Sequence, residues 1–371
     1  MDPRRLARKA VLGLERPVHG GLGWKYEGIE DFSSNLNPYG PPEEMSGFIS
    51  EAASKLAHYP DDSSEEFRSA ICEHHDVDMA NVIAGAGSAE LIRLFPETFL
   101  EAGDMVLMPR PTFSEYAFGC RLQGATVVEM PLEEENDLRL DIGKVIENIG
   151  GCKAVYLCNP NNPTGNIVPR KEVLELVREC ERASVLMFLD ETLLELVKGS
   201  KDISCVKEVD SFSNLFVIRS LTKCFAMPGM RIGYGVGGRD IVKLMSSARL
   251  SWNLGKIEQH VGARLLRDCQ GHVAKAADMM ASEGTRMSRE IARTGVVEAR
   301  VPDSFFFFSR CNGMKGSDVQ GEMLERKVLV RDCASFGAPF DSYVRFAVKT
   351  PERNDMLISA FRSLAEARGR D

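Results

Sequence analysis

The chain has 371 residues, of which 44% are hydrophobic and 27% are charged, and its formal net charge is −8. This composition excludes a disordered, collagenous or coiled-coil protein. The length corresponds to about two domains or one large α/β domain. An acidic chain without a long Lys/Arg block argues against nucleic acid or an anionic membrane as a partner.

The N-terminal segment predicts neither export nor a membrane anchor. The basic residues Arg4 to Lys9 are followed by only a few apolar residues before Pro17, so the apolar region of a signal peptide is missing. The longest apolar runs are far too short to cross a bilayer. Ten scattered cysteines include no C-x-x-C pair and no histidines at zinc-finger spacing. We therefore expect a cytoplasmic protein with reduced thiols and no metal site.

Glycine and proline breakers crowd the first forty residues, so we expect residues 1–42 to form an arm laid over the rest of the protein. In residues 43–254, short β-branched runs alternate with helical patterns, which is typical of a mostly parallel sheet covered by helices on both faces. The expected strands are 104–108, 126–130, 153–158, 184–190, 215–219 and 232–236, and the clearest helices are 88–100 and 170–182. The acidic run 133–137 is expected to be a solvated loop.

The pattern changes in residues 255–371, which we expect to form a smaller α+β domain. A long helical stretch covers 256–294, and a final helix covers 352–367. Between them lie isolated strands, expected at 305–310, 328–331 and 344–348.

A glycine loop precedes the helix expected from Ser88. The exposed amides of Gly87, Ser88 and Ala89 could hold a phosphate at the positive end of that helix. The loop matches neither the G-x-x-x-x-G-K-[ST] pattern nor a full G-x-G-x-x-G pattern, so a purely structural turn is the alternative.

Polar residues also end three consecutive expected strands. Asn161 and Asn162 follow the strand 153–158, and Asp190 closes the strand 184–190. Ligands in open α/β sheets collect at the carboxyl ends of strands. A carboxylate in that place could cap a helix, or it could meet a cation or a protonated ring nitrogen.

The third of these strands ends in Ser220-Leu221-Thr222-Lys223, and Arg231 follows shortly after. A lone lysine is usually a solvated surface charge. Here a phosphate-binding loop, a strand-end carboxylate and a strand-end amine occur together. These are the parts that hold pyridoxal phosphate (PLP): they neutralise its phosphate, hold its pyridinium proton and link its aldehyde as a Schiff base. The sequence therefore predicts a PLP site.

The order of the motifs G-A-G-S-A-E, P-T-F, N-P-N-N-P-T-G, D-E, S-L-T-K and P-G-M-R resembles fold-type I PLP enzymes of the histidinol-phosphate aminotransferase group. The segments H-G-G, D-F-S-S-N-L-N-P, R-S-L-T-K and V-R-D-C-A-S-F are similar to its threonine-phosphate decarboxylase branch, which serves cobalamin synthesis. The resemblance runs from about residue 19 to the end. It implies an α/β fold-type I architecture, with a mostly parallel sheet between helices, a smaller C-terminal α+β domain and an N-terminal arm.

The resemblance also implies a role for each matching residue. Lys223 would link to the cofactor and afterwards shuttle protons, and Asp190 would pair with the pyridine nitrogen. Asn162 would bond to the ring hydroxyl, and Phe113 would stack on the ring. Tyr59 matches a tyrosine that reaches a phosphate across a dimer interface, which implies a homodimer. The residues implied for the cofactor phosphate are Ser88, Ala89, Ser220, Thr222 and Arg231.

On the substrate side, the resemblance implies a set of polar residues that hold a phosphorylated amino acid. Arginine suits this task because its guanidinium binds phosphate or carboxylate in a bidentate manner. The pose matters, because only the α-carbon bond that is perpendicular to the cofactor ring breaks. The implied residues are His19, Gly20, Asn35, Asn162, Arg331 and Arg345.

One position departs from the group. The aminotransferases usually have D-E-A-Y where this chain has Asp190-Glu191-Thr192-Leu193, so the contact of the tyrosine hydroxyl with the ring oxygen is absent. The decarboxylase branch commonly has phenylalanine at that position. Loss of the hydroxyl favours decarboxylation, although leucine matches neither branch.

We therefore expect a homodimeric PLP-dependent lyase that decarboxylates threonine phosphate or serine phosphate to a phosphorylated amino alcohol for cobalamin synthesis. One methyl group is worth only about 1–3 kcal/mol of discrimination, so both substrates stay open. The alternative enzyme is a histidinol-phosphate aminotransferase that uses 2-oxoglutarate. Two other classes of protein fit less well. For a nicotinamide oxidoreductase, the glycine loop of this chain is incomplete and Lys223 is unexplained. A non-catalytic PLP-binding module would lack the full set of substrate cations.

Overall fold

A seven-stranded sheet in the order β2-β8-β7-β6-β5-β3-β4 organises the structure, which is a computed structural model describing residues 1–18, 20–21 and 23–369. Its strands are β2 (Val82–Gly85), β3 (Met105–Arg110), β4 (Thr126–Pro131), β5 (Ala154–Cys158), β6 (Leu186–Asp190), β7 (Leu215–Ser220) and β8 (Gly233–Gly237). The strands from β3 to β7 pair in parallel, whereas β8 runs antiparallel to both β2 and β7. The sheet is therefore mostly parallel, as predicted.

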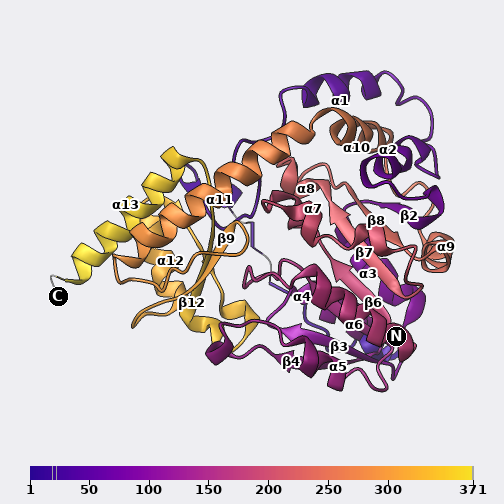
Figure 1. The fold of residues 1–371 in the computed structure, drawn as a ribbon, viewed down its shortest axis with the longest axis horizontal. Coiled ribbons are helices and arrows are strands. Elements are labelled where there is room, and N and C mark those ends of the chain that lie inside the picture. The colour runs from indigo at the N-terminus through magenta and orange to yellow at the C-terminus, as the bar shows by residue number, and fades with distance from the viewer. Residues whose placement is uncertain (19, 22, 370–371) are drawn as a thin grey trace.

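Helices cover both faces of this sheet (Figure 1). Successive side chains of a strand point to opposite faces. In β7, Leu215 and Val217 join one core, and Phe216 and Ile218 join the other. The first face packs against α2 (Glu65–His75), α5 (Ile142–Glu147), α6 (Arg170–Arg182) and α10 (Lys256–Asp268). The second face packs against α3 (Ser88–Phe99), α4 (Ser114–Leu122) and α9 (Arg239–Ala248).

The long helix α11 (Gln270–Ala292) leads away from the large sheet to a three-stranded sheet in the order β11-β12-β9 (Figure 1). That sheet contains β9 (Phe306–Arg310), β11 (Arg331–Asp332) and β12 (Tyr343–Ala347), and α12 (Gly316–Glu325) and α13 (Pro351–Arg368) pack near it. The remaining α-helices are α1 (Met45–Ala53), α7 (Ser200–Ile203) and α8 (Leu221–Cys224). Short 3-10 helices lie at Pro3–Arg5, Lys9–Val11, Gly23–Lys25, Met79–Asn81, Glu134–Asn136, Leu194–Leu196, Val206–Glu208, Ala334–Phe336 and Phe340–Ser342.

Most predicted elements are confirmed, and two need correction. The helical stretch 256–294 is two helices, because the helical conformation is interrupted at Cys269. The strand expected at 328–331 is divided: β10 (Val328–Leu329) pairs in parallel with β1 (Glu30–Asp31) of the N-terminal segment, and β11 pairs with β12. The short buried strand β2 was not predicted. The division into residues 1–42, 43–254 and 255–371 stays a prediction.

The acidic run 133–137 is mostly exposed to solvent, as predicted, and it also contacts the C-terminal part of the chain. Glu134 accepts a hydrogen bond of 2.8 Å from the Tyr343 hydroxyl. Asp137 pairs with Arg300. These contacts join segments more than 160 residues apart, which charge patterning alone does not indicate. No helix of the described residues is both long and apolar enough to span a membrane.

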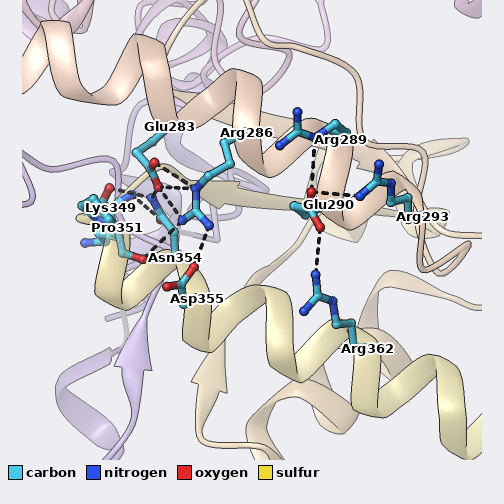
Figure 2. Close-up of polar contacts among 10 residues, drawn as sticks. All are labelled: Glu283, Arg286, Arg289, Glu290, Arg293, Lys349, Pro351, Asn354, Asp355 and Arg362. Atoms are coloured by element: carbon cyan, nitrogen blue, oxygen red, sulfur yellow. Dashed lines mark hydrogen bonds and ion pairs between the residues drawn. The ribbon is translucent and has the colours of Figure 1, made fainter.

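Polar contacts fix α11 to α13 beside the small sheet (Figure 2). Asn354 is fully buried; its Oδ1 accepts from the backbone N–H of Lys349 at 2.8 Å, and its Nδ2 donates to Glu283 at 2.9 Å. Arg286 of α11 also bonds to Glu283 and reaches Asp355 of α13. Asn354 thus holds the turn that follows β12 against α11.

We predict that Asn354→Ala lowers the free energy of unfolding by about 2 kcal/mol or more, because a buried backbone N–H and a buried carboxylate each lose a partner. Urea denaturation followed by circular dichroism measures this. The control is Arg289→Ala, whose side chain is 65% exposed beside Glu290 and is expected to cost less than about 0.5 kcal/mol. Equal losses in the two variants would contradict the assignment.

Candidate active site

The ends of β5, β6 and β7 bring three polar side chains to one face of the sheet. Cys158 lies beside Asp190 in the β5–β6 register, and Asp190 lies beside Ile218 in the β6–β7 register. By the alternation of side chains, Cys158, Asp190 and Ser220 then point to the face that α3 and α4 cover. They line a cavity of about 170 Å³. The full lining is Ser88, Ala89, Ile92, Phe113, Tyr116, Cys158, Asn162, Asp190, Thr192, Leu193, Ser220, Thr222, Lys223 and Arg231.

One end of this pocket is an anion cradle. Gly87 precedes α3 with φ +76°, and a Cβ there would lie 2.9 Å from Nη2 of Arg231. A side chain would therefore fill the space between the helix N-terminus and the guanidinium. The hydroxyl of Thr222 is buried and finds no hydrogen-bond partner among the residues that the structure describes. An orphan hydroxyl, free amides at a helix start and a guanidinium suit a phosphate.

Asp190 lines the pocket and is buried. The backbone N–H of Thr192 donates to Oδ1 at 2.8 Å, and the hydroxyl of Tyr116 donates to Oδ2 at 2.5 Å. Burial raises the pKa of Asp190, while these hydrogen bonds oppose the rise. A carboxylate held in this way can accept a hydrogen bond from a protonated ring nitrogen.

Lys223 lies in the short helix α8 that follows β7. Its pKa is lowered to about 8, first by burial and then by the positive charges of Arg345 and Arg231, whereas Asp190 acts in the opposite direction. An amine with this pKa is neutral in an appreciable fraction of molecules near neutral pH. Lys223 can therefore act both as a nucleophile and as a proton carrier.

Arg345 of β12 faces the same site from the small sheet. Its Nη1 donates to Oδ1 of Asn162, and its Nη2 donates to the carbonyl of Ser33 at 2.9 Å. Its buried Nε has no partner among the described residues. Burial lowers the pKa of Arg345 to about 10, so the guanidinium stays charged at neutral pH and retains a donor for an anion.

The segment after β1 lies against Lys223. The backbone N–H of Asn37 donates to the carbonyl of Lys223 at 2.9 Å, and the Asn37 side chain donates to the carbonyl of Cys224 at 2.8 Å. In the same segment, Oδ1 of Asn35 is buried and has no partner in the described part of the chain. The N-terminal segment thus brings Asn35 to the neighbourhood of the predicted nucleophile.

Arg331 lies opposite Arg345 in the register of β11 and β12. It donates to the hydroxyl of Ser335 at 2.9 Å and to the carbonyl of Val18 at 3.3 Å. A Cβ on Gly20 would lie 3.5 Å from the Arg331 side chain. Residues 18 and 20 thus cover Arg331, whereas His19, also predicted for the substrate, lies outside the described residues.

The structure does not bring Tyr59 to this pocket within the chain. Its side chain is 81% exposed and stacks on Trp252 at a centroid distance of 4.9 Å. Phe113 does line the pocket, and it also lines a larger cavity of about 580 Å³ between residues 13–18, residues 108–121 and residues 335–337.

Several residues of the site were not predicted. Tyr116 lies three residues after Phe113, the N-cap residue of α4, and the two rings are in contact with their centroids 5.6 Å apart. Arg219 and Glu191 point to the opposite face of the sheet from Asp190, where they pair at 2.7 Å, and Glu195 pairs with Arg219 at 2.8 Å. This buried ion-pair cluster ties the ends of β6 and β7 together. Opposite charges at the ends of two consecutive expected strands, Glu191 after one and Arg219 in the next, were its signal in the sequence.

The donor set fits the phosphate, the ring nitrogen and the aldehyde of PLP. The cradle at Gly87 and Thr222 would hold the phosphate, Asp190 the ring nitrogen, and Lys223 the aldehyde. No group of His, Cys, Asp and Glu suited to a metal ion occurs among the described residues. The fold and this pocket together define a PLP-dependent enzyme.

Comparison with known proteins identifies the family. The sequence model of the family "Aminotransferase class I and II" matches residues 27–361. A "Putative threonine-phosphate decarboxylase" of Caldanaerobacter subterraneus subsp. tengcongensis is 33% identical over 94% of both chains. Histidinol-phosphate aminotransferase of Methanocaldococcus jannaschii is 29% identical over 91% of this chain and 89% of that protein. The chain belongs to the class I and II aminotransferase family of PLP-dependent enzymes.

Solved structures agree with this fold. Histidinol-phosphate aminotransferase from Clostridium acetobutylicum superposes with a TM-score of 0.85 at 26% identity, covering 91% of this chain and all of that one. The enzyme of the same name from Sinorhizobium meliloti, in complex with pyridoxal-5'-phosphate, gives a TM-score of 0.86 at 20% identity over 97% of both chains. The predicted fold class and the predicted cofactor are thus confirmed.

When bound, PLP supplies an electron-poor ring that stabilises negative charge at the α-carbon of an amino-acid substrate. The residues of this chain would set the conditions for that chemistry. Asp190 would keep the ring nitrogen protonated, and Lys223 would hold or deliver a proton near the α-carbon. The covering segment around Asn35 would exclude water from the pocket.

We predict that the rate at which Lys223 of the cofactor-free protein captures PLP rises about tenfold per pH unit up to about pH 8 and then levels off. The reason is that only the neutral amine attacks an aldehyde. Stopped-flow absorbance measures this rate, and Lys223→Ala provides the blank. Arg345→Met removes a nearby positive charge and should move the break to higher pH. A wild-type break near the ordinary lysine pKa of 10.5 would contradict the lowered value.

Proposed function

We propose that the protein decarboxylates L-threonine O-phosphate, or serine phosphate, to a phosphorylated amino alcohol for corrinoid synthesis. The observation that carries this proposal is the pair of arginines on the small sheet. Arg331 and Arg345 lie opposite each other on neighbouring strands, and each donates to a backbone carbonyl of the N-terminal segment. Arg345 also donates to Asn162 of the pocket lining. Two guanidinium groups suit a substrate that carries both a phosphate and a carboxylate.

The corner of the pocket after Asp190 also favours this reaction. Leu193 is buried and lines the pocket with an apolar side chain, where the aminotransferases that the sequence resembles carry a tyrosine hydroxyl. Leu193 cannot bond to the cofactor's ring oxygen, so Asn162 would do so alone. The Caldanaerobacter relative with 33% identity, which is named "Putative threonine-phosphate decarboxylase", supports the same function.

The alternative function is histidinol-phosphate aminotransferase, a name carried by the relative with 29% identity. The two activities make different demands on the arginines. Histidinol phosphate has a phosphate but no carboxylate on its α-carbon, whereas threonine phosphate has both. A transaminase also needs an oxoacid acceptor, and the lyase needs none.

We further propose that the enzyme is a cytoplasmic homodimer in which Tyr59 of one subunit reaches the cofactor phosphate of the other. The exposed stack of Tyr59 on Trp252 supports this, because two large aromatic rings at the surface suit a protein interface. All ten cysteines are free thiols, which suits a reducing compartment.

We predict that the purified enzyme with PLP releases carbon dioxide from threonine phosphate without any added oxoacid. Coupled detection of carbon dioxide and mass spectrometry of the phosphorylated amino alcohol measure the reaction. Lys223→Ala is the inactive control. Turnover of histidinol phosphate that depends on 2-oxoglutarate, with no carbon dioxide from threonine phosphate, would replace the lyase with the aminotransferase.

We predict that Arg331→Ala lowers kcat/KM for threonine phosphate by about 30- to 1000-fold, because charge-assisted bonds to the substrate are lost. The affinity for PLP should change by less than about threefold, since Arg331 is not part of the pocket lining. Steady-state kinetics and PLP titration measure the two effects. The matched control is Arg293→Ala, a 68% exposed side chain at the end of α11. Unchanged kinetics in Arg331→Ala would remove this residue from the substrate site.

A further inference from the structure

Tyr116 is a fully buried tyrosine in the first turn of α4, and its hydroxyl meets the carboxylate of Asp190. The bond from the hydroxyl to Oδ2 is 2.5 Å long, and it joins residues 74 positions apart in the sequence. The ring packs edge-on against Phe113 at 5.6 Å and near Tyr156 at 5.8 Å. These contacts fix the ring, so the hydroxyl cannot turn away from Asp190 without repacking the core.

A carboxylate in this position needs such a donor. Removal of a charge from water is costly unless hydrogen bonds or opposite charges replace the lost solvation. The pKa of the Tyr116 hydroxyl is raised well above 10 by burial and by Asp190, so it stays protonated throughout the ordinary pH range. Tyr116 is therefore always the donor, and Asp190 is always the acceptor in this pair.

We propose that Tyr116 is a positioning residue. Its hydroxyl, which is bonded to Oδ2 of Asp190, keeps Asp190 ionised and orients the other carboxylate oxygen, Oδ1, toward the ring nitrogen of PLP. This inference rests on the placement of Asp190 against that nitrogen, which belongs to the function proposed above. With Oδ2 bonded to Tyr116 and Oδ1 to the Thr192 N–H, the plane of the carboxylate is fixed.

The other groups around Asp190 do not replace this donor. Cys158 on β5 is a buried thiol whose pKa is raised, so it carries no charge there. Glu191 points to the opposite face and is paired with Arg219 at 2.7 Å. Lys223 acts on Asp190 through its positive charge and not as a hydrogen-bond donor to the carboxylate, so it does not fix the plane of that group.

The variant Tyr116→Phe tests the proposal through PLP affinity as a function of pH. Without the donor, the pKa of Asp190 rises, and at neutral pH a larger fraction is protonated and cannot accept the ring proton. We expect PLP to bind about 10- to 100-fold more weakly at pH 7. The difference from the wild type should narrow as the pH rises, because Asp190 then ionises in the variant as well. PLP titration of the apoprotein, followed by absorbance, measures this.

The matched control is Tyr156→Phe. Tyr156 is equally buried, lies in the same aromatic cluster and interacts with Cys120 instead of Asp190. Its loss should leave PLP affinity within about threefold of the wild type at every pH. Equal effects of the two variants, or a deficit in Tyr116→Phe that does not change with pH, would overturn the positioning role.

Asp190→Asn separates this inference from the proposal on which it rests. If Asp190→Asn leaves PLP affinity unchanged, the placement of Asp190 at the ring nitrogen fails. If Asp190→Asn weakens PLP and Tyr116→Phe does not, only the role of Tyr116 fails. In the double variant, Tyr116→Phe should add no further loss, since its effect passes through Asp190.

A second variant keeps the test decisive if Tyr116→Phe does not fold. Incorporation of 3-fluorotyrosine at position 116 keeps the ring and makes the hydroxyl a stronger donor. The acid limb of the PLP-binding profile should then move to lower pH, because a stronger donor lowers the pKa of Asp190. An unmoved limb would overturn the proposal.

Discussion

The burial of the Asp190 carboxyl group is the constraint on which the rest of the site depends. Burial opposes the ionised form, yet a protonated ring nitrogen needs an ionised partner. The protein resolves the conflict with fixed donors, the hydroxyl of Tyr116 and the N–H of Thr192. Because each donor is itself held by packing or by the backbone, the strand end, α4 and the following turn must keep their places for the charge to persist.

The same alternation that turns Asp190 toward the pocket turns Glu191 and Arg219 away from it. Their pair, extended to Glu195, is buried on the far side of the same two strand ends. Buried ion pairs are weak sources of stability, but loss of one partner leaves an uncompensated charge and is strongly destabilising. The cluster therefore resists any sliding of β6 against β7, and it keeps Asp190 and Lys223 at a fixed separation across those strands.

Local patterns predicted much of this molecule, and contacts between distant segments account for what was missed. The helix 170–182 and the strand ends that carry Asp190 and Lys223 follow from periodicity and turn residues, which act over a few positions. Tyr116 could not be assigned to Asp190, because α4 must first pack on the sheet for the two to meet. Likewise, Glu134 and Asp137 of the acidic run meet Tyr343 and Arg300, which lie far away in the sequence. Residues 328–331 look like one strand, yet their two halves pair with different segments of the chain, and only tertiary structure decides that.

Although the net charge of the chain is −8, the site is locally positive, and its cationic groups lower one another's pKa. Burial and the charges of Arg345 and Arg231 lower the pKa of Lys223, and burial and Arg331 lower that of Arg345. Repulsion between these like charges raises the free energy of the folded state when no anion lies between them. A bound phosphate or carboxylate would relieve it, so the anions would stabilise the folded state by mass action as well as fill the site. Arg331 and Arg345 belong to the small sheet, whereas Lys223 and Arg231 lie in the segment that joins β7 to β8 of the large sheet, so bound anions would bridge the two parts of the chain.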